Sequence, residues 1–397
     1  NVFPSLVLYR PAANESVAKM TRIAIPNETS PKDQRTAMTP INLGKLVRAG
    51  AEVQVEAGLG AGCGYSDEQY REAGAGVNGD RREMFESADL ILRLNRPTFD
   101  EVAQLKQGAV HVSYLDPFNE RGLVEALRDR QVSAVSMEMI PRTSRAQKMD
   151  ALSSQASLAG YVMVIQAANQ LNRILPMMMT PSGTIKPARV FVIGAGVAGL
   201  QAIATAKRLG ARVTAFDTRA VVAEQVESLG ASFLNIELGE TGQTEDGYAR
   251  QLTPEQLAMQ QQGQAEEIAR SDIVITTAQL FGRKPPLLVT ADTVRGMQPG
   301  SVIVDMAAES GGNVEGSVAG EVVERDGVTI IGSGNWSGQV CRDASNMYSN
   351  NLFNLVDEYW DAELQQFTLD LEDEILVGCL ITHAGAIVNA TIKQQYA

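Results

Sequence analysis

Three glycines at the spacing Gly-x-Gly-x-x-Gly are the feature of this chain best suited to chemistry. Gly194, Gly196 and Gly199 directly follow the apolar run Val-Phe-Val-Ile that begins at Val190. In a strand–turn–helix unit the first glycine allows a tight turn, the second lets a pyrophosphate approach the backbone, and the third lets the helix pack closely. Free N–H groups at the start of the helix then hold the phosphates. The pattern predicts a dinucleotide site.

An acidic residue stands where the second strand of this unit should end. Asp217 lies about 20 residues after Gly199, the separation expected for a ribose-binding carboxylate. Such a carboxylate accepts hydrogen bonds from the adenosine ribose and repels a 2′-phosphate, which favours NAD over NADP. Arg219 follows closely and could pair with a phosphate instead. Because Asp217 holds the strand-end position, we expect NAD(H).

Two later loops should reach the same site. Ala278 and Gln279 follow a predicted strand at 273–276, and Asp305 ends another at 302–305. Loops at the carboxyl ends of parallel strands line the cofactor crevice. We expect Ala278 and Gln279 to contact the cofactor, whereas the loop after Asp305 fits either a contact or an ordinary connection.

A dense polar segment, residues 141–155, precedes a predicted long helix. It contains Arg142, Gln147, Asp150 and Ser153, which suit binding of the carboxamide, ribose and phosphates of a nicotinamide nucleotide. The alternative is a solvated helix start, in which Asp150 and the serines after it only cap the helix. The residues alone leave both interpretations open.

Strands alternating with helices are expected to position these groups, which predicts parallel sheets covered by helices. The expected strands of a first block are 22–26, 52–56, 90–94, 110–114 and 133–137, with helices at 39–49, 67–73, 101–105 and 121–129. A second block has strands at 190–193, 212–216, 273–276, 302–305 and 329–331 and a helix at 200–209. Long helices at 152–174 and 346–360 should join the blocks, and the tail 371–388 should return to the first.

Composition sets outer limits. With 397 residues, two domains are expected. The net charge of −13 disfavours nucleic acid and acidic membrane surfaces as partners. Three scattered cysteines and two histidines argue against a disulfide framework, a metal site or a His-based triad. We find neither a secretory signal nor an apolar run of about 18 residues, so no membrane insertion is expected.

Longer stretches carry a family resemblance. They are residues 141–161, 194–211, 224–233, 271–278 and 371–388. Through them the chain resembles the soluble NAD(H)-binding first domain of proton-translocating nicotinamide nucleotide transhydrogenase, and more broadly alanine dehydrogenase. The resemblance implies two Rossmann-like, doubly wound α/β domains with parallel sheets, joined by two long helices, with NAD in the interdomain cleft. The implied domains are 20–152 with 346–397, and 153–345, after an N-terminal extension at 1–19.

The resemblance also assigns roles to single residues. It places Arg142, Gln147, Asp150 and Ser153 beside the nicotinamide ring as the catalytic set. A mobile loop carrying Gly247 and Tyr248, otherwise an ordinary exposed loop, would close over the nucleotide. The expected cofactor-binding residues are Arg142, Thr143, Ser144, Arg145, Gln147, Gly194, Gly196, Val197, Gly199, Asp217, Thr218, Arg219, Gly247, Tyr248, Gln260, Ala278 and Gln279.

The implied activity is hydride exchange between NAD(H) on this chain and NADP(H) on a partner. Such transfer between nicotinamides needs no general acid, base or metal. The expected partners are the NADP(H)-binding and membrane domains of the transhydrogenase and a second copy of this chain. The expected place is the cytoplasmic side of the membrane, held through those partners, with little activity for the chain alone.

Departures weaken the alanine dehydrogenase alternative. Those enzymes bind and activate pyruvate with a lysine and a histidine, and the matching positions here are Asn95 and Asp116, although Arg35 is retained. Trp336, within residues 332–338, and Asn27 also depart from the relatives. A free-standing alanine dehydrogenase-like oxidoreductase and a non-catalytic NAD-binding module remain alternatives. The two histidines are not expected to act: His111 should be a hydrogen-bonded core residue, and His383 should be exposed.

Overall fold

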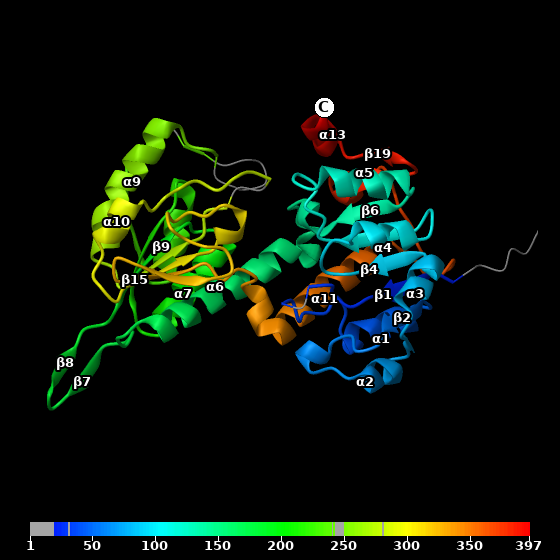
Figure 1. Ribbon diagram of the computed structural model, residues 1–397, viewed down its shortest axis with the longest axis horizontal. Helices are drawn as coiled ribbons and strands as arrows, with labels where there is room; N and C mark the ends of the chain where they lie inside the picture. The colour runs from blue at the N-terminus through cyan, green and yellow to red at the C-terminus, as the bar shows by residue number, and fades with distance from the viewer. Residues whose placement is uncertain (1–19, 31, 240, 243–249, 280–281) are drawn as a thin grey trace, which may run out of the picture.

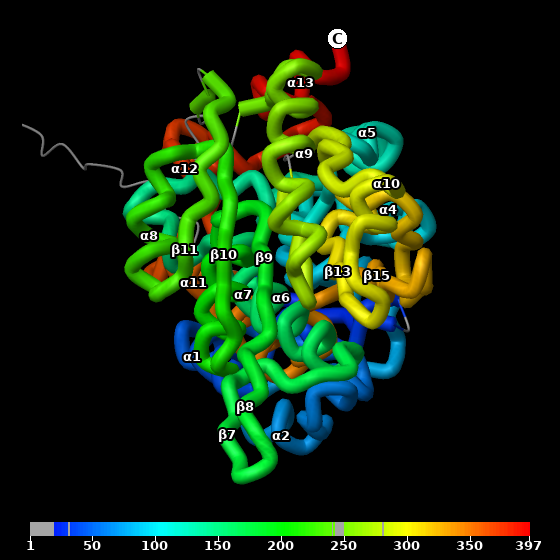
Figure 2. The backbone as a smooth tube through the Cα atoms, turned by 90° about the vertical axis from the view of Figure 1, so that its left-hand side faces the viewer, coloured from blue at the N-terminus to red at the C-terminus, as the bar shows by residue number. Residues whose placement is uncertain are grey.

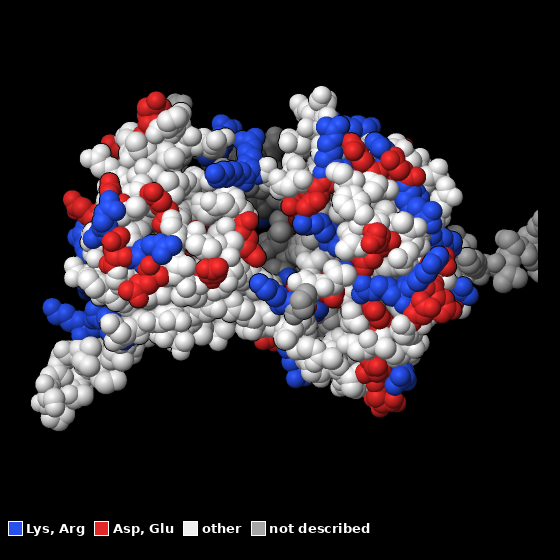
Figure 3. Space-filling model, in the orientation of Figure 1, with Lys and Arg blue, Asp and Glu red and all other residues white. Residues whose placement is uncertain are grey.

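Two α/β lobes lie on either side of a groove and are connected by long helices (Figures 1 and 3). This computed structural model describes residues 20–397 except 31, 240, 243–249 and 280–281. Helix α6 (Ala151–Gln170) runs from one lobe to the other, and α11 (Cys341–Glu358) returns into the first lobe. The predicted extension 1–19 and the Gly247–Tyr248 pair lie outside the described residues.

The first lobe is built on an eight-stranded sheet of order β19-β18-β6-β5-β4-β1-β2-β3. Its strands are β1 (Arg22–Ile25), β2 (Glu52–Glu56), β3 (Gly76–Asn78), β4 (Leu90–Leu92), β5 (Val110–Ser113), β6 (Ser133–Ser136), β18 (Leu380–His383) and β19 (Ala386–Ile387). Its helices are α1 (Pro40–Arg48), α2 (Asp67–Glu72), α3 (Arg81–Ser87), α4 (Phe99–Gln104), α5 (Arg121–Asp129), α12 (Glu374–Cys379) and α13 (Ala390–Tyr396). The chain leaves this sheet after β6 and returns with β18.

The second lobe is built on a seven-stranded sheet of order β11-β10-β9-β12-β13-β15-β14. Its strands are β9 (Arg189–Ile193), β10 (Arg212–Phe216), β11 (Ser232–Phe233), β12 (Ile273–Thr276), β13 (Val302–Asp305), β14 (Val322–Arg325) and β15 (Val328–Ile331). Its helices are α7 (Val197–Arg208), α8 (Ala223–Ser228), α9 (Pro254–Ala269) and α10 (Ala291–Arg295). Strand order reverses beside β9, which opens a crevice at the carboxyl ends of β9 and β12.

Apolar side chains cover both faces of each sheet, as the apolar strand sequences predict. In β2 only Val53 and Val55 are buried, because this strand alternates, whereas every residue of β4, β12 and β13 is buried. The predicted fold class, two α/β domains with mainly parallel sheets, is confirmed. The edges differ from the expectation, because β18 and β19 run antiparallel next to β6, and β14 runs antiparallel to β15.

A hairpin projects from the second lobe. Its strands β7 (Met178–Thr180) and β8 (Gly183–Ile185) pair only with each other and point away from both lobes (Figures 1 and 2). A second small hairpin, β16 (Trp360–Asp361) with β17 (Gln366–Phe367), follows α11. None of the helices in the described part of the chain combines the length and apolar character needed to cross a bilayer.

Both histidines differ from their predictions. His111 is fully buried in β5, but neither ring nitrogen has a hydrogen-bond partner among the described residues. It is therefore a core residue, as predicted, although not a hydrogen-bonded one. His383 is half-buried rather than exposed, because it lies in β18, where its Nδ1 is 2.9 Å from the Ser133 hydroxyl. The predicted domain boundaries stay predictions.

Candidate functional site

The glycine-rich turn joins β9 to α7 in a conformation that requires its first glycine. Gly194 has φ of +101°, and its N–H donates to the Phe216 carbonyl at 2.8 Å. A Cβ on Gly194 would lie 2.5 Å from the Thr277 hydroxyl oxygen. Both the positive φ and the close contact exclude a side chain, so Gly194 allows the tight turn that the sequence predicts.

The other two glycines have different surroundings. A Cβ on Gly199 would lie 1.8 Å from the Gly194 carbonyl oxygen, so the turn itself needs Gly199. Gly196 precedes Val197, the first residue of α7, at φ of −79°, and a Cβ there would meet nothing within 4 Å. Nothing in the fold demands glycine at position 196. The open space beside the helix start fits a pyrophosphate brought against the backbone.

Asp217 lies beside this turn, as predicted, but it is already engaged. Its carboxylate accepts the Ala195 N–H at 2.7 Å, and it accepts the Arg219 N–H, Nε and Nη2 at 2.8–2.9 Å. The hydrogen bonds to Asp217 raise the pKa of Arg219. Arg219 is thus drawn onto the carboxylate, and Thr218 connects the two. A ribose would compete with Arg219 for Asp217.

The loop after β12 borders the same turn. The Thr277 hydroxyl donates to the Gly194 carbonyl at 3.0 Å, which brings Ala278 and Gln279 next to the glycines. Ala278 is half-buried and Gln279 is exposed. Asn313 Nδ2 donates to the Ala278 carbonyl at 3.0 Å and fixes the loop. Both predicted contact residues therefore lie at the crevice.

Asp305 has a structural task instead. Its fully buried carboxylate accepts the N–H groups of Ala307, Asn313 and Val314 at 3.0–3.2 Å. These bonds hold the loop after β13, so the ordinary-connection interpretation applies to this loop. Gln260, another predicted contact, is buried on α9.

The polar segment ends in a capped helix. The Asp150 carboxylate accepts the Ser153 N–H at 2.8 Å and its hydroxyl at 2.5 Å, so Asp150 is the N-cap of α6. The capping alternative is therefore present. It leaves the second interpretation open, because Asp150 and Ser153 are only half-buried and Gln147 is exposed at the start of the short 3₁₀ helix η3 (Gln147–Met149).

The rest of this segment divides between the groove region and the first lobe. Arg142 and Ser144 are exposed, and Thr143 is half-buried. Arg145 turns to Asp373, with its Nη2 2.5 Å from Oδ1. Burial raises the pKa of Asp373, but its hydrogen bonds to Tyr359 and Arg145 outweigh this and lower that pKa. Arg145 therefore ties the segment to the tail before α12.

Helix α6 links the polar segment to the glycine turn. A Cβ on Gly160 would lie 2.2 Å from the carbonyl oxygen of Ala198, so α6 crosses the first turn of α7 in direct backbone contact. About 15 Å of helix separates this crossing from Asp150. The two predicted motifs thus lie along one helix that spans the groove (Figures 1 and 3).

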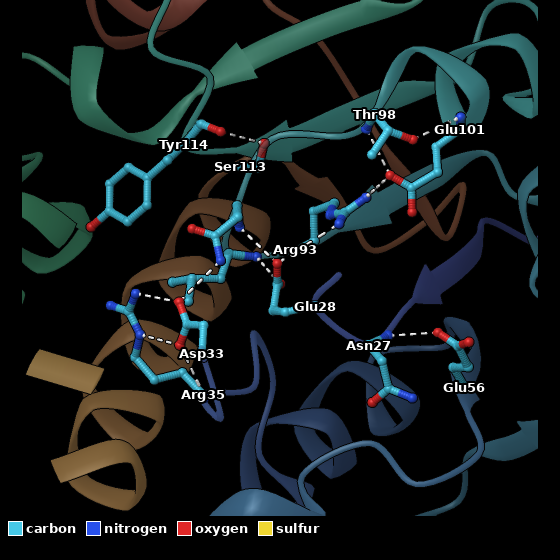
Figure 4. Close-up of polar contacts among 12 residues, drawn as sticks. Asn27, Glu28, Asp33, Arg35, Glu56, Arg93, Thr98, Glu101, Ser113 and Tyr114 are labelled. Atoms are coloured by element: carbon cyan, nitrogen blue, oxygen red, sulfur yellow. Dashed lines mark hydrogen bonds and ion pairs between the residues drawn. The ribbon is translucent and has the colours of Figure 1, made fainter. Parts of the chain in front are cut away.

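A cluster of buried charged groups occupies the first lobe at the ends of β1 and β4 (Figure 4). Arg35 pairs with Asp33, its Nη2 lying 2.6 Å from Oδ2, and both side chains are less than a tenth exposed. Burial raises the pKa of Asp33, but the hydrogen bonds and charge of Arg35 outweigh it and hold that pKa below its usual range. Asn95 Nδ2 also donates to Asp33 at 3.1 Å.

The remaining donor atoms of Arg35 cross to other elements. Its Nη1 donates at 3.0 Å to Gln155 on α6 and at 3.0 Å to Ser337 in the 3₁₀ helix η6 (Ser337–Val340). Arg35 therefore joins the first lobe, the connecting helix and the segment before α11. With all these contacts made, Arg35 is unavailable to a substrate carboxylate in this conformation.

Sequence reasoning missed the deeper part of this cluster. Arg93 is fully buried, and its Nη1 donates to Glu101 at 3.0 Å. Glu28 accepts the N–H groups of Leu94 and Asn95 at 2.7 and 3.1 Å. Burial raises the pKa of Glu28, and the charge of Arg93 only partly opposes this rise. These groups position the loop that carries Asn95.

The positions that depart from the relatives have clear contacts. Asn27 donates its N–H to Glu56 at 2.7 Å (Figure 4). Asp116, at φ of +51°, accepts the Asn119 Nδ2 at 2.8 Å. Trp336 is buried in the second lobe, with its indole N–H 3.3 Å from the Met306 carbonyl. Trp336 is thus a packing residue.

Comparisons with known proteins agree with this architecture. The family model "Alanine dehydrogenase/PNT, N-terminal domain" matches residues 24–159, and "Alanine dehydrogenase/PNT, C-terminal domain" matches 163–390. The first of the separate chains that make up the NAD(P) transhydrogenase alpha subunit of Rhodospirillum rubrum is 44% identical, covering 95% of this chain and 100% of the relative.

Two solved structures are also similar. The crystal structure of transhydrogenase from Sinorhizobium meliloti has a TM-score of 0.82 and 43% identity, covering 92% of this chain and 100% of that one. An L-alanine dehydrogenase has a TM-score of 0.77 and 25% identity, covering 95% and 99%. The resemblance predicted from the sequence is therefore confirmed, and the chain belongs to the alanine dehydrogenase/PNT family.

Proposed function

We propose that this chain is the NAD(H)-binding component of a proton-translocating transhydrogenase and exchanges hydride with NADP(H) bound to a partner. One observation carries the choice over oxo acid reduction. Arg35, the cation that an oxo acid carboxylate would need, is neutralised by Asp33, and neither a lysine nor a histidine stands at Asn95 or Asp116. A reaction without proton transfer suits such a site.

The proposed binding roles follow the motifs. N–H groups at the start of α7, around Val197, hold the pyrophosphate against Gly196, and Asp217 binds the adenosine ribose. Since Asp217 would also repel a 2′-phosphate, NAD(H) is preferred to NADP(H). The predicted contact residues outside this turn are Arg142, Thr143, Ser144, Arg145, Gln147, Gly247, Tyr248, Gln260, Ala278 and Gln279.

The chain's own contribution to the reaction is positional. When bound, NAD(H) supplies or accepts hydride at C4 of its nicotinamide ring. Arg142, Gln147, Asp150 and Ser153 orient that ring, and the lobes exclude water from the groove. Orientation and proximity lower the barrier because the two rings must meet in one geometry.

The proposal requires partners. These are an NADP(H)-binding domain, the membrane domain and a second copy of this chain, and in the full complex the transfer is coupled to proton translocation. Binding through those partners would place the chain at the cytoplasmic face of the membrane. The projecting hairpin supports a homodimer, because Met177, Met179 and Ile185 are 60%, 74% and 45% exposed there. Exposed apolar surface of this kind favours contact with another protein surface.

Replacing Asp150 by Asn is expected to slow hydride transfer by about tenfold or more. Asn caps a helix as well as Asp does, so α6 should keep its start, while the charge beside the nicotinamide is lost. The measurement mixes the chain with a purified NADP(H)-binding component of a related transhydrogenase and follows reduction of an NAD analogue by NADPH. Asp129→Asn, at an exposed carboxylate on α5, serves as the control and should keep the full rate.

The same assay decides between the three functions. Transfer only with the partner present supports the transhydrogenase component. NADH oxidation by pyruvate and ammonia without the partner would instead favour an alanine dehydrogenase-like enzyme, the candidate that the similar L-alanine dehydrogenase structure supports. NADH binding without turnover in either assay would point to a non-catalytic module.

Removing the carboxylate of Asp33 should expose what Arg35 can bind. Asp33→Ala is expected to destabilise the chain by about 3 kcal/mol or more, because it leaves a buried guanidinium without its counter-ion. Formate or pyruvate should restore part of the lost melting temperature in this variant and leave the native chain unchanged. Equal responses of both proteins would show that Asp33 does not shield Arg35.

A further inference from the structure

Two cysteines far apart in sequence lie face to face where the first lobe meets α11. Cys63 ends the 3₁₀ helix η1 (Ala61–Cys63), and Cys341 is the first residue of α11. The Cys63 Sγ is 3.4 Å from the Cys341 carbonyl oxygen, and the Cys341 Sγ is 3.2 Å from the Gly62 carbonyl oxygen. Each thiol thus rests on the backbone of the other's segment.

The two thiols differ in accessibility. Cys63 is 4% exposed and also contacts the Gln34 carbonyl and the Ser345 hydroxyl, each at 3.1 Å. Burial, with a smaller contribution from Cys341, raises the pKa of Cys63 to about 11. Cys63 is therefore a protonated, protected thiol at neutral pH. Cys341 is partly exposed at the start of its helix, so a dissolved oxidant reaches it first.

We propose that Cys63 and Cys341 are a redox-active dithiol, which a peroxide converts into a disulfide between η1 and the start of α11. The Cys341 sulfur attacks the peroxide O–O bond, giving a sulfenic acid and one water from hydrogen peroxide. The Cys63 sulfur then attacks the sulfenic sulfur, forming the S–S bond and releasing a second water. Two thiols are oxidised by two electrons, and one peroxide is reduced.

The backbone geometry permits this bond. A disulfide needs Cα atoms about 4.4–6.8 Å apart. Cα atoms of η1 and α11 approach within 8 Å of each other, so closure requires a small local movement. The third cysteine, Cys379, is fully buried in α12 and contacts neither partner, which makes it an internal control.

The bond would form at the hinge between the lobes. Ser345, which contacts Cys63, accepts the Thr36 N–H at 2.9 Å, and the adjacent Arg35 bonds to α6 and η6. Drawing Cys63 onto Cys341 therefore pulls on the loop that fixes the groove. On the proposed function, the oxidised chain should release NADH at a rate at least about threefold different from the reduced chain.

The first test treats the reduced full chain with hydrogen peroxide and maps its peptides without reductant. The expected result is a peptide pair linked through Cys63 and Cys341, lost on adding dithiothreitol, with Cys379 still a free thiol. Cys63→Ser should instead accumulate sulfinic acid on Cys341, and Cys341→Ser should give neither product. Sulfinic acid on Cys341 of the native chain with no linked peptide would overturn the proposal.

The second test measures NADH release from both redox forms, with Cys63→Ser as the control that should not respond to peroxide. A linked peptide with unchanged NADH release would overturn the effect on the hinge. Absence of NADH binding by the reduced chain would count against the proposed function alone, because peptide mapping establishes the disulfide independently.

Discussion

Replacing Gly196 by alanine is expected to weaken NADH binding by about a hundredfold while changing the free energy of unfolding by less than about 1 kcal/mol. The backbone at Gly196 has φ of −79°, which alanine adopts freely, and an added Cβ meets nothing within 4 Å. The methyl group would instead fill the space proposed for the pyrophosphate. Calorimetric titration with NADH and thermal unfolding of the same samples measure the two quantities.

The matched control is the neighbouring glycine of the same turn. In Gly199→Ala the Cβ would lie 1.8 Å from the Gly194 carbonyl oxygen, so the turn must move. We expect a loss of about 3 kcal/mol or more in stability together with the loss of binding. The two variants separate the ligand from the fold. Native affinity for NADH in Gly196→Ala would place the pyrophosphate elsewhere.

This contrast shows how far the sequence could predict the site. The spacing around Gly194 predicts the turn because strand, glycines and helix are consecutive, so local geometry determines it. The pairing of Arg219 with Asp217 is not visible in the same way. A nearby cation reads equally well as a phosphate ligand, and only the folded chain shows it hydrogen-bonded to the carboxylate.

The buried charges of the first lobe were beyond sequence reasoning for a different reason. Glu28, Arg93 and Glu101 are types that normally face solvent, and each has its partner on another element. Burial of such groups is stable only when the partners converge, and convergence depends on the tertiary fold. A charged residue next to a strand end is the one signal that could have indicated it.

Fold prediction succeeded where one period continued over several residues. The strands 52–56 and 212–216 were predicted with the bounds that the structure has. The short strand β3 and the hairpin β7–β8 were missed, because β3 has three residues and the hairpin buries none of its strand residues. Helix α11 begins at Cys341 rather than at 346, since the polar run Arg-Asp-Ala-Ser hides that Ala344 and Ser345 are buried.

Lowering the pH from 7 to 5 is expected to cost the chain about 2 kcal/mol of stability through His111 alone. Burial, assisted by the charge of Arg93, lowers the pKa of His111 to about 3. The unfolded chain takes up a proton near pH 6.5, whereas the folded chain does not until about pH 3. Between these values the unfolded state binds more protons, so stability rises with pH and is lost as the pH falls.

Substituting His111 tests the sign and size of this effect. His111→Leu removes a fully buried side chain whose ring nitrogens have no partner among the described residues, so we expect no loss of stability at pH 7. At pH 5 the variant should exceed the native chain by about 2 kcal/mol more than at pH 7. Denaturant unfolding at several pH values measures the difference.

Val112→Ala, at the next buried position of β5, provides the control for that measurement. It should lower stability by about 1–3 kcal/mol at every pH and leave the pH dependence unchanged, because it removes packing without removing a titrating group. A native pH dependence retained in His111→Leu would contradict the assignment. Protons bound on unfolding would then have to be taken up by other groups, and the His111 ring would have to accept a proton inside the folded lobe.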